Sequence, residues 1–200
     1  MVTRRRMSHD ERRLQLLDTA AAMAGTEGAG ALTLARVAER AGVTKPVVYE
    51  HFETRTGLLT ALYHRMDDLQ VQSARAALDA RADSLEEAVA VLAEAYVDCA
   101  LNAGREFGTV TAALGSIAGT ETLLRTARER YAAIVLDAFE RFGPAGEDDS
   151  RPVMLGVVGA CEVLAREVAD GRLDRASAIR AISRIMLGTS AGPPPRPRSA

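Results

Sequence analysis

The stretch LTLARVAERAGVTKPVVYEHFETRTGLLTALY, residues 32–63 of this 200-residue chain, decides the fold. The spacing of its apolar residues predicts two short helices, 34–41 and 45–52, followed directly by a longer one. Thr33 is placed to cap the first short helix, because a threonine hydroxyl accepts a hydrogen bond from a free first-turn amide. Gly42 can adopt the left-handed backbone that a sharp turn between the helices needs. This arrangement is typical of a helix-turn-helix.

The second short helix carries the side chains suited to DNA. Thr44 is its expected cap, and Pro46 is tolerated because it lies in the first turn. A lysine can bind a guanine edge or a phosphate, a tyrosine a phosphate oxygen, and a valine a thymine methyl group. The chain has 24 arginines but a single lysine, which stands at the start of this helix. The residues expected on its exposed side or flank are Lys45, Val47, Tyr49, Glu50 and His51.

Helical periodicity continues along the rest of the chain, so we predict an all-α fold. Its parts are a three-helix helix-turn-helix domain with a basic arm (1–55), a larger helical domain (56–187) and a disordered tail (188–200). Serine followed three residues later by glutamate predicts capping boxes at Ser8 and Ser84. The residues expected on buried helix faces include Leu14, Leu17, Ala21, Ala24, Leu58, Leu59, Leu62, Met66, Leu69, Ile179, Ile182, Ile185 and Met186.

Composition limits the class of protein. Hydrophobic residues make up 48% of the chain and the net charge is −2, which does not suit a general polyanion binder. Residues 1–55 hold nine Lys or Arg against seven Asp or Glu, whereas 56–200 hold sixteen against twenty. A modestly basic end on an acidic body suits a protein that meets DNA through one face. Arg4, Arg5 and Arg6 are either an arm that reaches the minor groove or a solvated tail.

Other classes lack their motifs. Cys99 and Cys161 lie in apolar helical patterns without metal-ligand spacing, so we expect buried free thiols and a reducing cytoplasm. The arginines near the N-terminus are not followed by the apolar region of a secretory signal. The longest strongly apolar run, 153–161, is too short to span a bilayer. No phosphate-binding loop, nucleophile elbow or metal-binding pattern is present, so no enzyme, cofactor or metal site is expected.

Residues 8–65 resemble the DNA-binding domain of the TetR family of bacterial regulators. The resemblance lies in three ordered segments, TLARVAERAGV, TKPVVYEHF and TRTGLLTALY. It implies phosphate contacts for Thr33, Tyr49 and Arg55, the last in place of the usual lysine. Glu50 departs from the aromatic or small residue often found at its position. The full set of expected DNA-binding residues is Thr33, Arg36, Thr44, Lys45, Val47, Tyr49, His51 and Arg55.

The resemblance also implies a homodimer, formed by helices 150–170 and 174–187, on a palindromic double-stranded operator. The stretch 153–161 supports it, because a helix that is apolar on all sides must bury more than one face. A small apolar or amphipathic effector would bind among the helices of 84–142 and release a repressor from DNA. The residues suggested for this pocket are Tyr96, Cys99, Asn102, Thr109, Thr111 and Tyr131.

Two other functions remain open at this stage. The chain could be a non-specific architectural DNA-binding protein without effector control, although such proteins usually spread basic charge more widely. It could also be a helical adaptor whose helix-turn-helix binds protein. A footprint confined to one palindrome distinguishes a regulator from the first alternative, and gel shifts with genomic fragments test the second.

Overall fold

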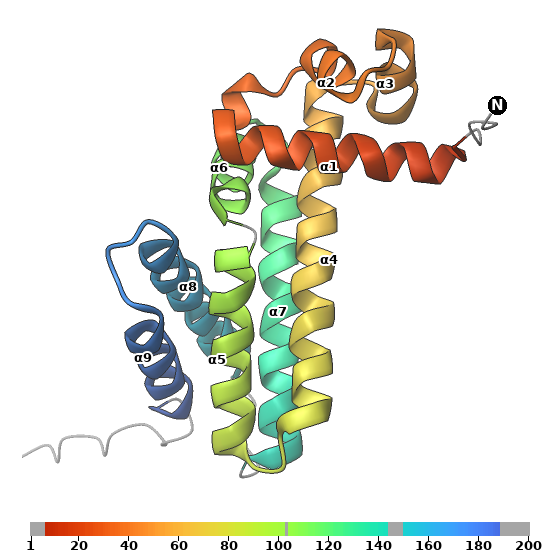
Figure 1. The fold of residues 1–200 in the computed structure, drawn as a ribbon. Helices are drawn as coiled ribbons and strands as arrows, with labels where there is room; N and C mark the ends of the chain where they lie inside the picture. Colours follow the sequence, from red (N-terminus) through yellow and green to blue (C-terminus); the bar gives the residue numbers. More distant parts are fainter. Residues whose placement is uncertain (1–6, 103, 144–149, 189–200) are drawn as a thin grey trace, which may run out of the picture. The chain divides into compact units, whose positions relative to one another are not determined.

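The computed structural model describes residues 7–102, 104–143 and 150–188, and every regular element in these ranges is a helix (Figure 1). The expected all-α class is confirmed. The arm and the tail beyond Gly188 lie outside the described residues. In chain order the helices are α1 (His9–Glu27), the 3-10 turn η1 (Ala29–Ala31), α2 (Leu34–Ala41), α3 (Lys45–Phe52), α4 (Arg55–Arg81), α5 (Leu85–Asn102), α6 (Gly104–Gly115), α7 (Glu121–Phe142), α8 (Ser150–Ala169) and α9 (Arg175–Gly188).

The chain packs as two units. The first comprises Met1–Leu69 and Ala103–Leu124, and therefore holds α1, α2, α3, the first half of α4, and α6. The second comprises Gln70–Asn102 and Arg125–Ala200, which hold the second half of α4, α5, most of α7, α8 and α9. The division of the chain after residue 55 into a DNA-binding domain and a larger domain remains a prediction.

Helix α1 starts and ends where the sequence predicts. The Ser8 amide donates to the Glu11 carboxylate at 2.7 Å, and the Glu11 amide donates to the Ser8 hydroxyl at 3.1 Å, which completes the capping box. Gly28 ends the helix with a φ of 79°. The buried face was predicted only in part, because Leu14 is 52% exposed. Leu17 and Ala24 are buried as predicted, and Leu16, Ala20 and Met23 complete the buried side of a helix that packs against α2 and α6.

Helices α2 and α3 pack closely around a small apolar wedge. The Arg36 amide donates to the Thr33 hydroxyl at 3.2 Å, so the predicted cap of α2 is confirmed. Gly42 has φ 67° and ψ 34°, the expected left-handed turn. Thr44 occupies the predicted N-cap position of α3 with an extended backbone, although its side chain makes no capping hydrogen bond. The core between the two helices contains Val37, Ala38, Val48 and Phe52.

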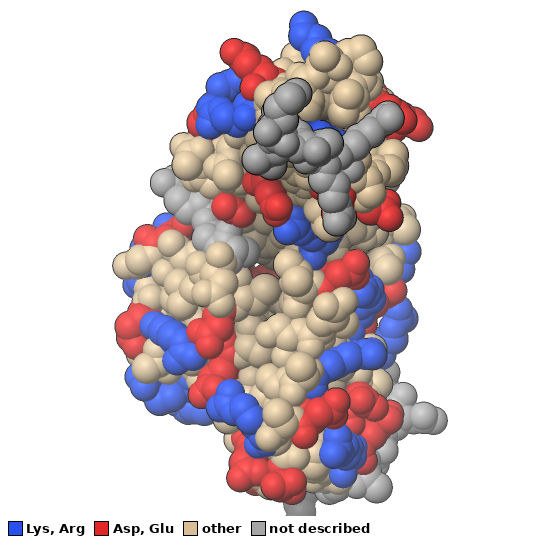
Figure 2. Space-filling view, turned by 45° about the vertical axis from the view of Figure 1, so that its right-hand side comes forward, with Lys and Arg blue, Asp and Glu red and all other residues tan. Residues whose placement is uncertain are grey.

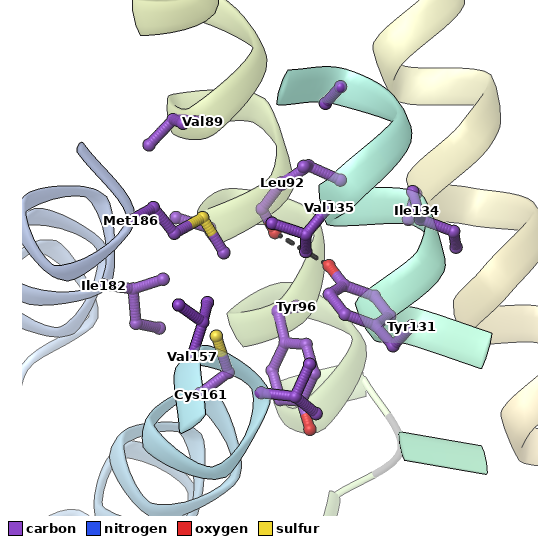
Figure 3. Packing of buried hydrophobic residues seen from close by; sticks show 14 of the residues in the cluster. Val89, Leu92, Tyr96, Tyr131, Ile134, Val135, Val157, Cys161, Ile182 and Met186 are labelled. Carbon is purple, nitrogen blue, oxygen red and sulfur yellow. Dashed lines mark hydrogen bonds between the residues drawn. The ribbon is translucent and has the colours of Figure 1, made fainter. Parts of the chain in front are cut away.

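In the second unit, α5 packs against both α8 and α9 (Figure 1). Its core brings apolar side chains of α5, α7, α8 and α9 together (Figure 3). The last helix was expected to bury Ile185, which is exposed. Ile182 and Met186, four residues apart, share a face of a 3.6-residue helix, whereas Ile185 is rotated away from it.

Helix α4 shows a similar difference. Leu69 was expected to be buried but is exposed, and the buried positions at this level are Met66 and Gln70. Their spacing of four residues keeps them on one face, whereas Leu69 lies about 100° before Gln70 around the helix. Val71, Ala74 and Leu78 continue the buried side. A polar residue therefore faces inward at Gln70 and an apolar one outward at Leu69.

Candidate nucleic-acid interface

One side of α3 belongs to the core and the other faces solvent. Val48 and Phe52 are buried, whereas Lys45 and Glu50 are exposed. Tyr49 is 50% exposed, so its ring and hydroxyl are accessible from solvent. The exposed side chains therefore include one cation at the start of α3 and one aromatic hydroxyl a turn later.

The N-terminal side of this face contains the two expected threonines. Thr33 is exposed and its hydroxyl already accepts from Arg36. Thr44 is exposed and its hydroxyl makes no capping bond, so it is available to a phosphate oxygen. Val47 is half-buried, with its backbone amide bonded to the Thr44 carbonyl at 3.1 Å.

Two of the expected contact arginines are engaged within the protein. The Arg36 guanidinium binds the Glu27 carboxylate, which also accepts from Arg40 at 2.7 Å. The hydrogen bond from Arg36 is the first cause that holds the pKa of Glu27 below its ordinary value. Arg55 donates from Nε to the Leu32 carbonyl and from Nη2 to the Ala29 carbonyl, both at 2.8 Å.

Arg55 therefore joins the start of α4 to the η1 region. A guanidinium carries five N–H donors, so three of those on Arg55 stay free of these two bonds. The expected phosphate contact would have to use them. In the free protein the Arg55 side chain connects α4 to the η1 region through these two hydrogen bonds.

His51 faces α1 with its ring. The ring lies 4.2 Å from that of His9, centroid to centroid, and its Nδ1 is buried without a hydrogen-bond partner. Burial is the first cause that lowers the pKa of His51, followed by the neighbouring His9. Arg13, one turn after His9 on α1, donates to the His51 carbonyl at 2.7 Å. His51 was expected nearer the bases, and the structure instead uses it in packing α3 against α1.

The junction between α3 and α4 has a strained backbone. Glu53 has φ 57° and ψ −53°, and the Thr54 amide donates to the Phe52 carbonyl at 2.5 Å, which forms a tight γ-turn. The Thr54 hydroxyl then accepts from the Gly57 amide at 2.9 Å and caps α4. Sequence reasoning placed a turn at Glu53 and Thr54, but side-chain types do not reveal that a non-glycine residue adopts a positive φ there.

Of the six residues expected in the effector pocket, the structure brings Tyr96 and Tyr131 into contact. Tyr96 and Tyr131 are buried, and their rings meet edge to face at 4.8 Å (Figure 3). The Tyr131 hydroxyl donates to the Leu92 carbonyl at 3.1 Å. Burial is the first cause that raises the pKa of Tyr96, whose hydroxyl also has a hydrogen bond with Gln70. Both tyrosines therefore serve the core of the second unit.

The other four expected pocket residues differ in position. Cys99 is half-buried and Asn102 is exposed at the end of α5. Thr109 and Thr111 belong to the first unit, where their hydroxyls donate to the Glu106 carbonyl at 3.0 Å and to the Phe107 carbonyl at 2.7 Å. These polar residues were grouped because they lie in the helices of residues 84–142. Their positions in the sequence do not reveal which packing unit each residue joins.

Apolar residues are exposed on α8 at intervals that keep them on one side. Val163 is 58% exposed, Val153 and Gly156 are also exposed, and Ala160, which lies between Gly156 and Val163 in the sequence, is half-buried.

On the face shown in Figure 2, acidic and basic side chains are interleaved. Among the described residues, no helix is long and apolar enough to cross a bilayer, and no group of three or more His, Cys, Asp or Glu is suited to a metal ion.

The fold and this face define a helix-turn-helix protein of the DNA-binding class. Residues 16–62 match the family model of the bacterial regulatory proteins, tetR family. Residues 16–62 are thus similar to the DNA-binding domain of that family. A segment of 93 residues is 38% identical to the HTH-type transcriptional activator FasR of Mycolicibacterium smegmatis, and it covers 46% of this chain and 42% of that protein. The match therefore spans less than half the length of that relative.

Solved structures share the fold over most of the chain. A TetR-like transcriptional regulator from Rhodococcus sp. RHA1 has a TM-score of 0.68 at 20% identity, covering 94% of this chain and 100% of that one. The fatty acid degradation regulator FadR from Bacillus halodurans has a TM-score of 0.71 at 19% identity, covering 88% and 95%. At these identities the likeness establishes the architecture alone.

Proposed function

We propose that this chain is a transcriptional regulator that binds a palindromic operator as a homodimer. The observation that carries the proposal is the division of α3, with Val48 and Phe52 in the core and Lys45 and Tyr49 in solvent, inside a TetR-family domain. A helix fixed on one side by the core presents its other side in a constant orientation, as base reading in the major groove requires.

Within this proposal the DNA contacts have different roles. Lys45 at the start of α3 meets a base edge or a phosphate, and Val47 lies against a thymine methyl group. Thr33, Thr44 and Tyr49 bind phosphate oxygens, which position the helix without reading sequence. Arg36, His51 and Arg55 act mainly by holding the domain in shape, as their internal bonds support.

The dimer forms through α8 and α9 in this proposal. The exposed apolar side of α8, with Val163 at its C-terminal half and the small residues Gly156 and Ala160 at its centre, supports close helix packing across a two-fold axis. Ile185 on α9 adds a further exposed apolar side chain. A two-fold dimer places its two α3 helices about 34–36 Å apart, one turn of DNA.

Effector control, by a small apolar or amphipathic molecule that favours a dimer unable to bind the operator, is supported by the family resemblance. The named relative FasR is a transcriptional activator, so a reporter gene behind the bound promoter decides the sign of control. We propose repression, seen as higher reporter expression when the regulator is deleted. Lower expression upon deletion would instead assign activation.

The test of the proposed function is selection of bound duplexes from a random library, followed by footprinting. The expected result is protection of one inverted repeat and a molar mass in solution of twice 21.3 kDa. Val163→Glu should give a monomer with weakened operator binding, whereas Val168, which is buried, serves as the control position through Val168→Ile. Equal binding to all duplexes, lost uniformly with salt, would favour the architectural alternative.

A further inference from the structure

The C-terminus of α3 is held by two side chains of α1 that lie one turn apart. His9 places its ring against the His51 ring at 4.2 Å. Arg13 donates from Nη1 to the His51 carbonyl at 2.7 Å. Since residues four apart share a helix face, one side of α1 reaches the same end of α3 through both residues.

Arg13 also contacts the next residue of α3. Its guanidinium carbon lies 4.8 Å from the centroid of the Phe52 ring, over its face. Phe52 is almost fully buried, so the ring under the cation cannot turn freely. A single side chain therefore fixes a main-chain carbonyl at residue 51 and an aromatic plane at residue 52. Together these contacts restrain both the rotation of α3 and its displacement along its axis.

The contact of Arg13 lies at the C-terminal end of α3, where backbone carbonyls need partners from outside the helix. The last carbonyls of a helix have no partner within the helix, and α3 has only two turns. The Tyr49 carbonyl accepts from the Glu53 amide, and the Phe52 carbonyl accepts from the Thr54 amide. The His51 carbonyl accepts from Arg13 alone among the bonds found in the described residues. A cation at this end also suits the negative end of the helix dipole.

We propose that Arg13 is a positioning residue for operator recognition: it fixes the orientation of α3 from behind, without touching DNA. This inference rests on the proposed function, because an orientation matters only if α3 reads bases. Lys45 and Tyr49 bind the duplex, whereas Arg13 determines where they point. Its loss therefore reduces discrimination between sequences more than it reduces attraction to DNA.

The test compares Arg13→Met with Arg12→Met in the full chain. Both variants lose one positive charge at neighbouring positions, but Arg12 bonds to Gln15 within α1, whereas Arg13 bonds to the His51 carbonyl of α3. The probes are a duplex selected by the wild-type protein and a duplex of scrambled sequence. Arg13→Met should lose at least about tenfold affinity for the selected duplex and less than about threefold for the scrambled one. The slope of log K against log salt should be the same for Arg13→Met and Arg12→Met.

Amide hydrogen exchange provides a second measurement that needs no DNA. Arg13→Met should accelerate exchange at the amides of Glu53 and Thr54 and leave those of Val37 and Ala38 in the α2 core unchanged. If all four amides exchange faster together, Arg13 supports the whole domain and the proposal is overturned. It is also overturned if both duplexes lose affinity equally and the salt slope falls by about 0.9, the signature of a lost phosphate contact.

The two failures are distinguishable. If the wild-type protein selects no sequence from the library, the proposed function fails, and the exchange experiment still decides whether Arg13 holds the end of α3. If the wild-type protein selects an operator and Arg13→Met discriminates as well as Arg12→Met does, only the role of Arg13 fails.

Discussion

The carbonyl oxygen of Phe52 lies so close to Gly57 that a Cβ on Gly57 would be 2.2 Å from it. The atom in the way belongs to the backbone of a strained turn and cannot move aside as a side chain would. Glycine is required here for space, since the positive φ of this junction lies at Glu53.

Gly57→Ala should therefore destabilise the first unit by about 1–3 kcal/mol, the usual cost of forcing an atom into occupied space. Gly108→Ala is the matched control, because a Cβ at Gly108 meets nothing within 4 Å and this glycine lies within α6. That change should stabilise the protein by about 0.5–1 kcal/mol. Urea unfolding followed by circular dichroism measures both, and equal stability of the two variants would contradict the prediction.

Glu27→Gln should strengthen non-specific DNA binding and increase its dependence on salt. The Glu27 carboxylate binds Arg36 and Arg40, and its removal frees both cations for phosphates. Each additional phosphate contact steepens the slope of log K against log salt by about 0.9. Glu39→Gln on α2 gives the same change of net charge. Fluorescence anisotropy with a scrambled duplex compares them, and identical slopes would show that the arginines are not released.

Acidification should weaken the first unit through His51. Its lowered pKa means that the folded state binds fewer protons than the unfolded state, whose histidine titrates near 6.5. The contribution of His51 to stability is therefore present above pH 6.5 and is lost as the pH falls through the folded-state value. Arg12, Arg13, His9 and Glu50 are the charged or titratable neighbours that act on it.

His51→Gln removes this titration. Between pH 7.5 and 5, the unfolding midpoint of the wild-type protein should fall more than that of the variant. An NMR titration of the His51 ring gives the pKa directly, and a midpoint at or above 6.5 would contradict the lowered pKa of this half-buried residue.

Cys161 should resist alkylation in the native protein, whereas Cys99 reacts. Burial raises the pKa of the Cys161 thiol from 9.0 to about 12, and the side chain is inaccessible. Its contribution to stability is full below pH 9, where the unfolded thiol keeps its proton, and is lost as the pH rises toward 12. Labelling with iodoacetamide at pH 8, read by mass spectrometry, should modify Cys99 first. In urea both cysteines should react alike, and equal native rates would refute the buried thiol.

The order and ends of the helices followed from local signals. Ser8 with Glu11, Thr33 and Gly42 each determine an end through bonds or backbone angles within a few residues, and such signals are readable from sequence. Buried faces were less predictable. Leu14 and Leu16 are equally apolar, and only packing against α2 and α6 decides which one is buried.

The candidate site shows the same limit. The exposed residues of α3 were predicted because they follow from the position of Val48 and Phe52 in one helix. The internal partners of Arg36 and Arg55 were not, because they depend on long side chains reaching across the fold. Arg13 gave one weak signal in advance, its place four residues after His9. Its partner lies 38 positions away in the chain.

The separation of the two sides of α3 has a consequence for how such proteins diversify. Lys45, Tyr49 and Glu50 project into solvent, and substitutions at such positions usually change stability by no more than about 0.5 kcal/mol. Descendants of this gene can therefore change these residues with little loss of folding stability. New DNA-binding preferences can then arise by substitutions that leave stability almost unchanged. Phe52 and Gly57, in contrast, tolerate few replacements.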